Sequence, residues 1–235
     1  MFNALELVQA ASDALSDRAD ALDTEHAVRG IDALPELDLH PILAQGLRTI
    51  GLGVVSEQPY PGPPGSRRGL TERERCDLVL LPEPGLGLVD PVVERRERDR
   101  AAGTLFESVA AAARAEPGRA RPDDAFWLEI KVVGQFCYTA GVPGANRSYA
   151  TDLVGSLTLD LRKLARDPVI VHAGVLMVLF TRDRATAEHD LAAAICRCLD
   201  RDVPAASPES DGLAIADRIG NAWCHVALVR ARPGG

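Results

Sequence analysis

The 235-residue chain has no apolar run that reaches the ~18 residues needed for a membrane-spanning helix. Its longest apolar stretch, Val169 to Phe180, is shorter than this and contains a histidine. The first residues show no basic segment of the kind that begins a secretory signal peptide. We therefore expect a cytoplasmic protein with no membrane partner.

The cysteines and histidines form no recognisable metal motif. Cys196 and Cys198 make a C-x-C pair, but no second pair is present to complete a zinc tetrahedron. None of the five histidines belongs to an H-E-x-x-H motif. Five cysteines, an odd number without a secretion signal, indicate reduced thiols and agree with a cytoplasmic location.

The chain has no net positive charge, and its aromatic residues are scarce. The formal net charge is −8, and aromatic residues make up 4% of the chain. A protein that binds nucleic acid over its whole surface is usually basic, so a polyanionic partner has to be met at a local patch or through metal ions. So few aromatic residues also argue against a platform on which bases stack.

Lysine is nearly missing from the sequence. Lys131 and Lys163 are the only two, against 24 arginines. Because arginine supplies the generic positive charge of this chain, each lysine is a candidate for chemistry that requires lysine itself.

Hydrophobic periodicity predicts an α/β protein with a mixed sheet flanked by helices on both faces. We expect helices over residues 2–22, 23–34, 39–50, 149–165 and 187–199, and strands over 53–57, 75–81, 126–133, 169–180 and 222–229. Residues 1–35 are expected to form an N-terminal helical extension, which either caps the domain or binds a partner. Residues 36–235 are expected to form the domain itself.

Three stretches between these elements are expected to be irregular. Residues 59–69 are dominated by proline and glycine, and both 134–148 and 203–211 have the composition of loops. A charged insertion at about 84–123 separates two strands, and part of it, about 92–115, is expected to be helical. Its arginines either grip a nucleic-acid backbone or lie on a solvated helix face among the acids.

Charged residues stand inside two of the apolar strands. Side chains alternate along a strand, so Glu129 and Lys131 share one face of strand 126–133. Asp77 is the lone acid of strand 75–81. Burying such groups is costly unless they are paired or bound to an ion. If the two strands are neighbours, Asp77 and Glu129 converge, and a cluster of carboxylates suits Mg²⁺ or Mn²⁺.

In these residues the chain resembles the PD-(D/E)XK nuclease superfamily, whose fold is that of many restriction endonucleases. Asp77 matches the motif aspartate, and Glu129 with Lys131 matches the E-x-K. Cys76 replaces the usual proline, and the insertion lengthens the interval between the two motifs. The resemblance implies a restriction-endonuclease-like mixed sheet with an αβββαβ core over about residues 36–180.

The resemblance also implies a catalytic site. Asp77, Glu129 and the backbone carbonyl of Ile130 would hold one or two Mg²⁺ (or Mn²⁺) ions, which polarise the scissile phosphate and acidify a bound water. Lys131 would orient that water or stabilise the transition state. Members often carry a further acid, for which Glu57 is the first candidate and Glu36 the second.

Other residues are weaker candidates for the same site. Gln135 would orient a carboxylate or touch the phosphate, and Arg162 with Lys163 would contact a phosphate. Each candidate also has a plainer structural interpretation. Glu129 with Lys131, and Asp160 with Lys163, would be surface ion pairs. Asp77 would be an edge-strand acid, Glu57 and Gln135 would be solvated, and the buried-strand histidines His172 and His225 would be satisfied core residues.

The leading prediction is a metal-dependent nuclease of DNA, an endonuclease in preference to an exonuclease, acting in defence, restriction, recombination or repair. Its acidic charge and small size favour a protein partner or a homodimer. The alternative is an inactive nuclease-like scaffold that binds proteins. A third possibility, an unrelated α/β enzyme, has no Gly-rich phosphate loop, G-x-S-x-G elbow or dinucleotide fingerprint to support it.

Overall fold

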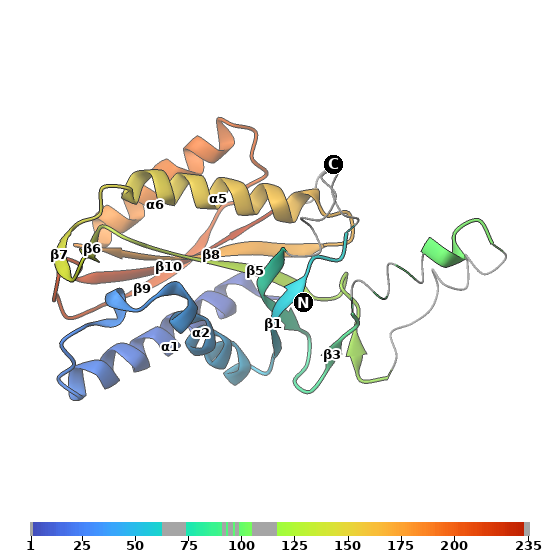
Figure 1. The fold of residues 1–235 in the computed structure, drawn as a ribbon, viewed down its shortest axis with the longest axis horizontal. Coiled ribbons are helices and arrows are strands. Elements are labelled where there is room, and N and C mark those ends of the chain that lie inside the picture. The colour runs from blue at the N-terminus through green and yellow to red at the C-terminus, as the bar shows by residue number, and fades with distance from the viewer. Residues whose placement is uncertain are drawn as a thin grey trace.

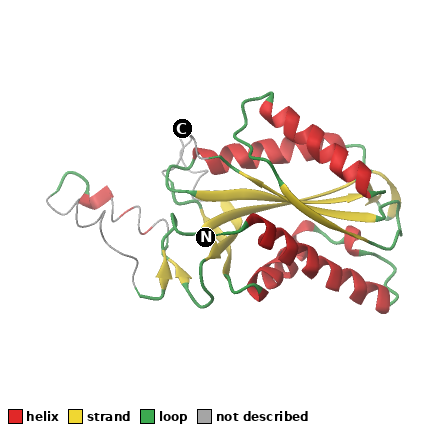
Figure 2. Ribbon diagram, turned by 180° about the vertical axis from the view of Figure 1, so that it is seen from behind, coloured by secondary structure: helices red, strands yellow, loops and turns green. Residues whose placement is uncertain are grey.

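The computed structural model describes residues 2–62, 74–90, 93, 96, 99–104 and 117–232. A six-stranded sheet lies between two layers of helices (Figures 1 and 2). The expected mixed α/β architecture with helices on both faces is therefore confirmed. Within the described ranges, no helix is both long and apolar enough to cross a membrane.

The sheet contains one parallel pair among antiparallel neighbours. Its strands, in spatial order, are β1 (Gly53–Pro59), β2 (Arg75–Leu81), β5 (Phe126–Gly134), β8 (His172–Thr181), β10 (Trp223–Arg230) and β9 (Glu209–Ala214). Only β5 and β8 run parallel. A parallel pair needs a crossover, and the helix between these two strands supplies it.

The helices cover the two faces of the sheet in pairs. They are α1 (Ala4–Thr24), α2 (Glu36–Thr49), α5 (Tyr149–Arg166) and α6 (Arg184–Leu199), with a short 3-10 turn, η1 (Ile31–Ala33). Helices α1 and α2 pack on one face, and α5 and α6 pack on the other (Figure 1). The apolar residues of α1 join those of α2 in one core, as expected if the N-terminal helix caps the domain.

The alternation expected along β5 is confirmed. Trp127 and Val133 belong to the core beneath α5 and α6, whereas Leu128 and Ile130 belong to the core beneath α1 and α2. Strand β8 is buried on both faces over nine of its ten residues, as its continuous apolar sequence predicts. The exception is His172, which is exposed at the start of the strand, so its expected place in the core is wrong.

One hairpin and one edge strand were not expected from the sequence. Residues 134–148 contain a hairpin of β6 (Phe136–Thr139) and β7 (Val142–Ala145), whose two turn residues both have positive φ. Edge strand β9 begins in the expected loop 203–211; most of its residues are exposed, so it lacks an apolar pattern. The helix expected over 23–34 is also wrong, because α1 ends at Thr24 and only η1 follows.

The two ends of the charged insertion lie together. Short strands β3 (Gly87–Leu88) and β4 (Arg119–Ala120) pair in parallel at its base. Most of the helix expected at about 92–115 lies outside the described residues, as do residues 63–73 of the Pro/Gly-rich connection.

Helices α1 and α2 approach closely at Gly46. A Cβ built there would lie 2.6 Å from the Ala10 carbonyl oxygen and 2.6 Å from the Ala14 Cβ. Gly155, inside α5, is a matched control, because a Cβ there meets no described atom within 4 Å. Both glycines lie in helix interiors, where alanine is normally preferred.

We expect Gly46→Ala to destabilise the protein by about 1–3 kcal/mol, because α1 and α2 have to separate. Gly155→Ala should instead stabilise it by about 0.5–1 kcal/mol through the helix preference alone. Urea denaturation of both variants measures this difference. Equal effects in the two variants would contradict the close packing at Gly46.

Candidate active site

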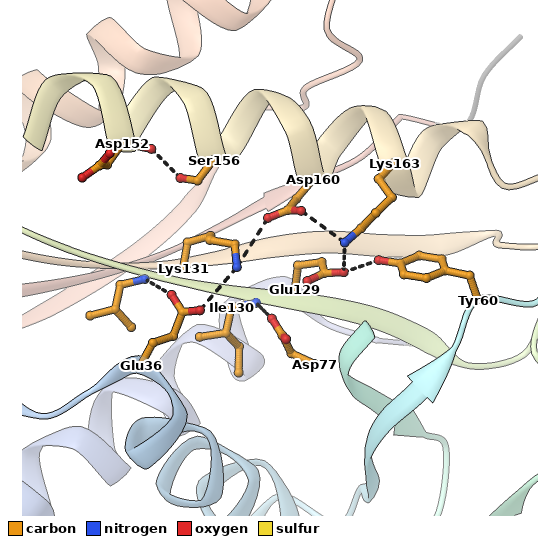
Figure 3. Close-up of polar contacts among 11 residues, drawn as sticks. Glu36, Tyr60, Asp77, Glu129, Ile130, Lys131, Asp152, Ser156, Asp160 and Lys163 are labelled. Carbon is orange, nitrogen blue, oxygen red and sulfur yellow. Dashed lines mark hydrogen bonds and ion pairs between the residues drawn. The ribbon is translucent and has the colours of Figure 1, made fainter. Parts of the chain in front are cut away.

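The central feature of the site is a gap between β2 and β5. Their backbone pairing ends at Leu128, although β5 continues to Gly134. Beyond that point the Ile130 N–H donates to Asp77 Oδ2 at 2.8 Å, and the Val132 N–H donates to Glu36 Oε2 at 3.0 Å (Figure 3). The carboxylates of Asp77 and Glu36 thus accept the two N–H groups of β5 for which β2 provides no backbone carbonyl. The N–H and C=O of one residue point toward the same neighbour, so the Ile130 carbonyl also faces this gap.

Glu129 is a buried acid on the α5 side of β5. It is 2% exposed, and its carboxylate accepts hydrogen bonds from Lys163 Nζ at 2.7 Å and from the Tyr60 hydroxyl. Tyr60 is held by stacking on Trp127, with ring centroids 6.0 Å apart. Burial raises the pKa of the Glu129 carboxyl, the Lys163 ammonium opposes this rise, and the charge of Asp77 adds to it.

Both lysines of the chain lie in this cluster. Lys131 Nζ lies 3.4 Å from Glu36 Oε1 and 3.7 Å from Asp160 Oδ2, and Lys163 Nζ lies 3.3 Å from Asp160 Oδ1 (Figure 3). Burial by itself would lower the pKa of each lysine. The surrounding carboxylates, Asp160 first for Lys131 and Glu129 first for Lys163, outweigh burial and raise both pKa values.

The cluster carries more acids than bases. Two lysines face the four carboxylates of Glu36, Asp77, Glu129 and Asp160. Asp160 is 8% exposed, and burial, together with the charge of Glu129, raises its pKa. An excess of negative charge among oxygen ligands is the environment that a divalent cation neutralises.

The three principal residues expected from the sequence converge. Asp77 from β2 lies beside Glu129 and Lys131 from β5, and its charge acts on both of them. Glu36, the second choice for the additional acid, contacts Lys131 directly. The first choice, Glu57, is exposed on β1 and lies next to Asp77 but outside the lysine cluster.

Of the weaker candidates for the site, Lys163 lies in the cluster, whereas Arg162 and Gln135 have hydrogen-bond partners elsewhere. Lys163 belongs to the cluster, where it binds Glu129 instead of standing free for a phosphate. Arg162 points elsewhere and donates to the backbone carbonyl of Arg201 at 2.8 Å. Gln135 accepts from the Arg182 N–H at 3.1 Å, which gives it a structural role at the end of β5. Asp160 does pair with Lys163, but in a buried cluster and not on the surface.

Sequence reasoning missed the roles of Tyr60 and Asp160. Tyr60 stands in a Pro/Gly-rich segment, and no local pattern connects it with β5. Asp160 carried one usable signal, since it precedes one of the two lysines by a single helical turn. Cys76, which stands where the motif has proline, is fully buried, and burial raises the pKa of its thiol. It is therefore a packing residue of the core.

Comparisons of the chain with protein-family models, with curated proteins and with solved structures found no match in any of the three. A functional conclusion therefore depends on the geometry and chemistry of this cluster.

We expect Lys163→Met to destabilise the protein by about 3–5 kcal/mol near pH 7.5, because it leaves the buried Glu129 charge without its closest partner. The pKa of Glu129 is already raised above its ordinary value of 4.5 and rises further without Lys163. Folding then favours the protonated acid, so the loss shrinks as pH falls toward 4.5. Thermal and urea unfolding of the parent and the variant between pH 4.5 and 8 measures this loss in the free energy of unfolding.

The control is the double variant Glu129→Gln/Lys163→Met, which removes both charges. Its loss at pH 7.5 should be smaller than the sum of the two single losses, and it should vary less with pH. Additive losses that do not depend on pH would show that the two side chains do not interact.

Proposed function

We propose that the protein is a metal-dependent nuclease of the PD-(D/E)XK type, which hydrolyses phosphodiester bonds, most readily in DNA. The observation that carries this proposal is the meeting of Asp77, Glu129 and Lys131 where β2 separates from β5. Acids and lysine in this arrangement are what phosphoryl chemistry requires: negative ligands for a cation and a positive group for the developing charge.

The order of elements around the site supports the restriction-endonuclease-like fold. With the short strands β3, β4, β6 and β7 set aside, the chain runs α2, β1, β2, β5, α5, β8, and the first three of these strands are antiparallel neighbours. Helix α5 then crosses over to place β8 parallel to β5. This is the αβββαβ sequence that the resemblance implies.

The residues fit a divalent cation. Asp77 and Glu129 would supply carboxylate oxygens and Ile130, whose N–H already donates to Asp77, would supply its carbonyl, so the ligand set would be hard oxygen of the kind that Mg²⁺ takes. A bound dication would polarise the scissile phosphate and lower the pKa of a coordinated water. The surplus of carboxylates over lysines would be balanced by such an ion.

The two lysines would act differently. Lys131 lies between Glu36 and Asp160, and its side chain is 22% exposed, so its ammonium would orient a water or stabilise charge on the phosphate. Lys163 instead holds Glu129, together with Tyr60, and so fixes the direction of that carboxylate. We therefore assign a catalytic role to Lys131 and a positioning role to Lys163.

The net charge of the protein bears on how it would find its substrate. A net charge of −8 leaves little general attraction for a polyanion, so targeting by a protein partner or by a second copy of the chain would complete the enzyme. Defence, restriction, recombination and repair are settings in which such a small nuclease acts.

We expect Mg²⁺- or Mn²⁺-dependent cleavage when the protein is incubated with supercoiled plasmid, linear duplex, single-stranded DNA and RNA. Lys131→Ala and Asp77→Asn should lower the cleavage rate by on the order of 100-fold or more, since each removes a group that acts on the reacting phosphate or its cation. The rates come from gel assays of plasmid nicking and linearisation.

The matched control is Arg197→Ala, which removes one positive charge from the exposed face of α6. It should cleave like the parent protein. Cleavage that persists in Lys131→Ala would overturn the site. If no protein cleaves any of the substrates with Mg²⁺ or Mn²⁺ present, the result would favour the scaffold alternative.

A further inference from the structure

A second group of metal-ligating side chains lies at Asp77, on the side of α2 and β1. A ring nitrogen of His40, from α2, and one carboxylate oxygen each from Glu57 and Asp77 lie within 4.8 Å of one another. Three such ligand atoms at this separation can reach a common cation after small side-chain movements. This group is separate from Glu129, whose carboxylate is held by Lys163 and Tyr60.

His40 is the observation that points to a ligand. It is only 8% exposed, and its buried Nε2 has no hydrogen-bond partner in the described part of the chain. Leaving a buried polar atom without a partner costs about 1–3 kcal/mol. A cation bound at Nε2 would remove this cost, because a neutral imidazole nitrogen is a good metal ligand.

The two acids form no ion pair with a basic side chain of the described residues. The charge of Asp77 acts on Lys131, but the ion pairs of Lys131 are with Glu36 and Asp160. Arg75 donates to the backbone carbonyl of Glu57 and not to its carboxylate. Asp77 uses Oδ2 to accept the Ile130 N–H. Carboxylates that converge without a countercharge repel one another until a proton or cation intervenes.

The backbone of β1 directs Glu57 toward this place. Its φ is +54°, a left-handed conformation that is unusual for a residue other than glycine. The register pairs Ser56 with Leu78 and Gln58 with Cys76, so the ladder is interrupted where Glu57 faces Asp77. Residues other than glycine that are held in this backbone conformation cluster at active sites and ligand-binding sites.

We propose that His40, Glu57 and Asp77 bind a first-row transition dication, with Mn²⁺ preferred over Mg²⁺. A set of one imidazole and two carboxylates suits transition metals, whereas Mg²⁺ takes oxygen ligands and keeps much of its water. As a statement about catalysis this inference rests on the proposed function, because Asp77 is shared. The binding itself is measurable without any cleavage.

The test measures Mn²⁺ binding to the full-length protein by electron paramagnetic resonance and calorimetry, with Mg²⁺ titrated in parallel. His40→Gln and Glu57→Gln should each weaken Mn²⁺ binding by about tenfold or more, since each removes one ligand. His40→Gln should also narrow the preference for Mn²⁺ over Mg²⁺. His189→Gln, on the exposed surface of α6, removes a histidine elsewhere and should bind as the parent does.

Because His40 is buried, its variant is first checked for a native unfolding transition; the exposed Glu57 provides an independent test if His40→Gln is unstable. Unchanged Mn²⁺ affinity in a folded His40→Gln or in Glu57→Gln overturns the site, as does a parent protein that binds no Mn²⁺. Weakened binding in both supports the site even where no nuclease activity is found. If His40→Gln and Glu57→Gln both still cleave DNA and bind Mn²⁺ as the parent does, the proposed nuclease function stands and the proposed Mn²⁺ site is rejected.

Discussion

The ion pair between Glu129 and Lys163 joins the central strand to the helix that crosses over it. A carboxylate that is 2% exposed cannot stay charged without a close partner, and α5 delivers one at 2.7 Å. The pair therefore constrains the rotation of α5 about its axis. That rotation in turn brings Asp160 within reach of Lys131. The other side chains of the cluster are arranged around this contact.

The separation of β2 from β5 within the sheet is the second constraint on the candidate site. Where the two strands part, the free N–H groups of β5 are satisfied by Asp77 and Glu36 in place of backbone carbonyls. The other oxygen of Glu36, Oε1, faces Lys131 Nζ at 3.4 Å. A sheet that continued its ladder would have neither the space nor the ligands for a cation, so the break in pairing creates the candidate site.

The candidate site was predictable where a residue stood out in its own strand. Asp77 and the Glu129–Lys131 pair are charged groups within apolar strands, and period-2 alternation was enough to place Glu129 and Lys131 on one face. Glu57 and Glu36 could not be ranked, because each is an ordinary acid in its local sequence. Tyr60 and Asp160 have no local pattern that connects them with β5. The role of Tyr60 comes from its hydrogen bond to Glu129, 69 residues away in the sequence. The role of Asp160 comes from the ion pair that joins α5 to Lys131 in β5.

The sequence by itself determined the element order, the principal strands and helices, and the faces of β5, because these depend on local periodicity and turn residues. It did not reveal edge strand β9 or the hairpin of β6 and β7, whose exposed residues carry no apolar pattern. Only the tertiary structure decided that Lys131 and Lys163 meet at Asp160, that β2 leaves β5 at Leu128, and that His40 lies beside Asp77. These are long-range contacts, set by how helices pack on the sheet, and local sequence carries no record of them.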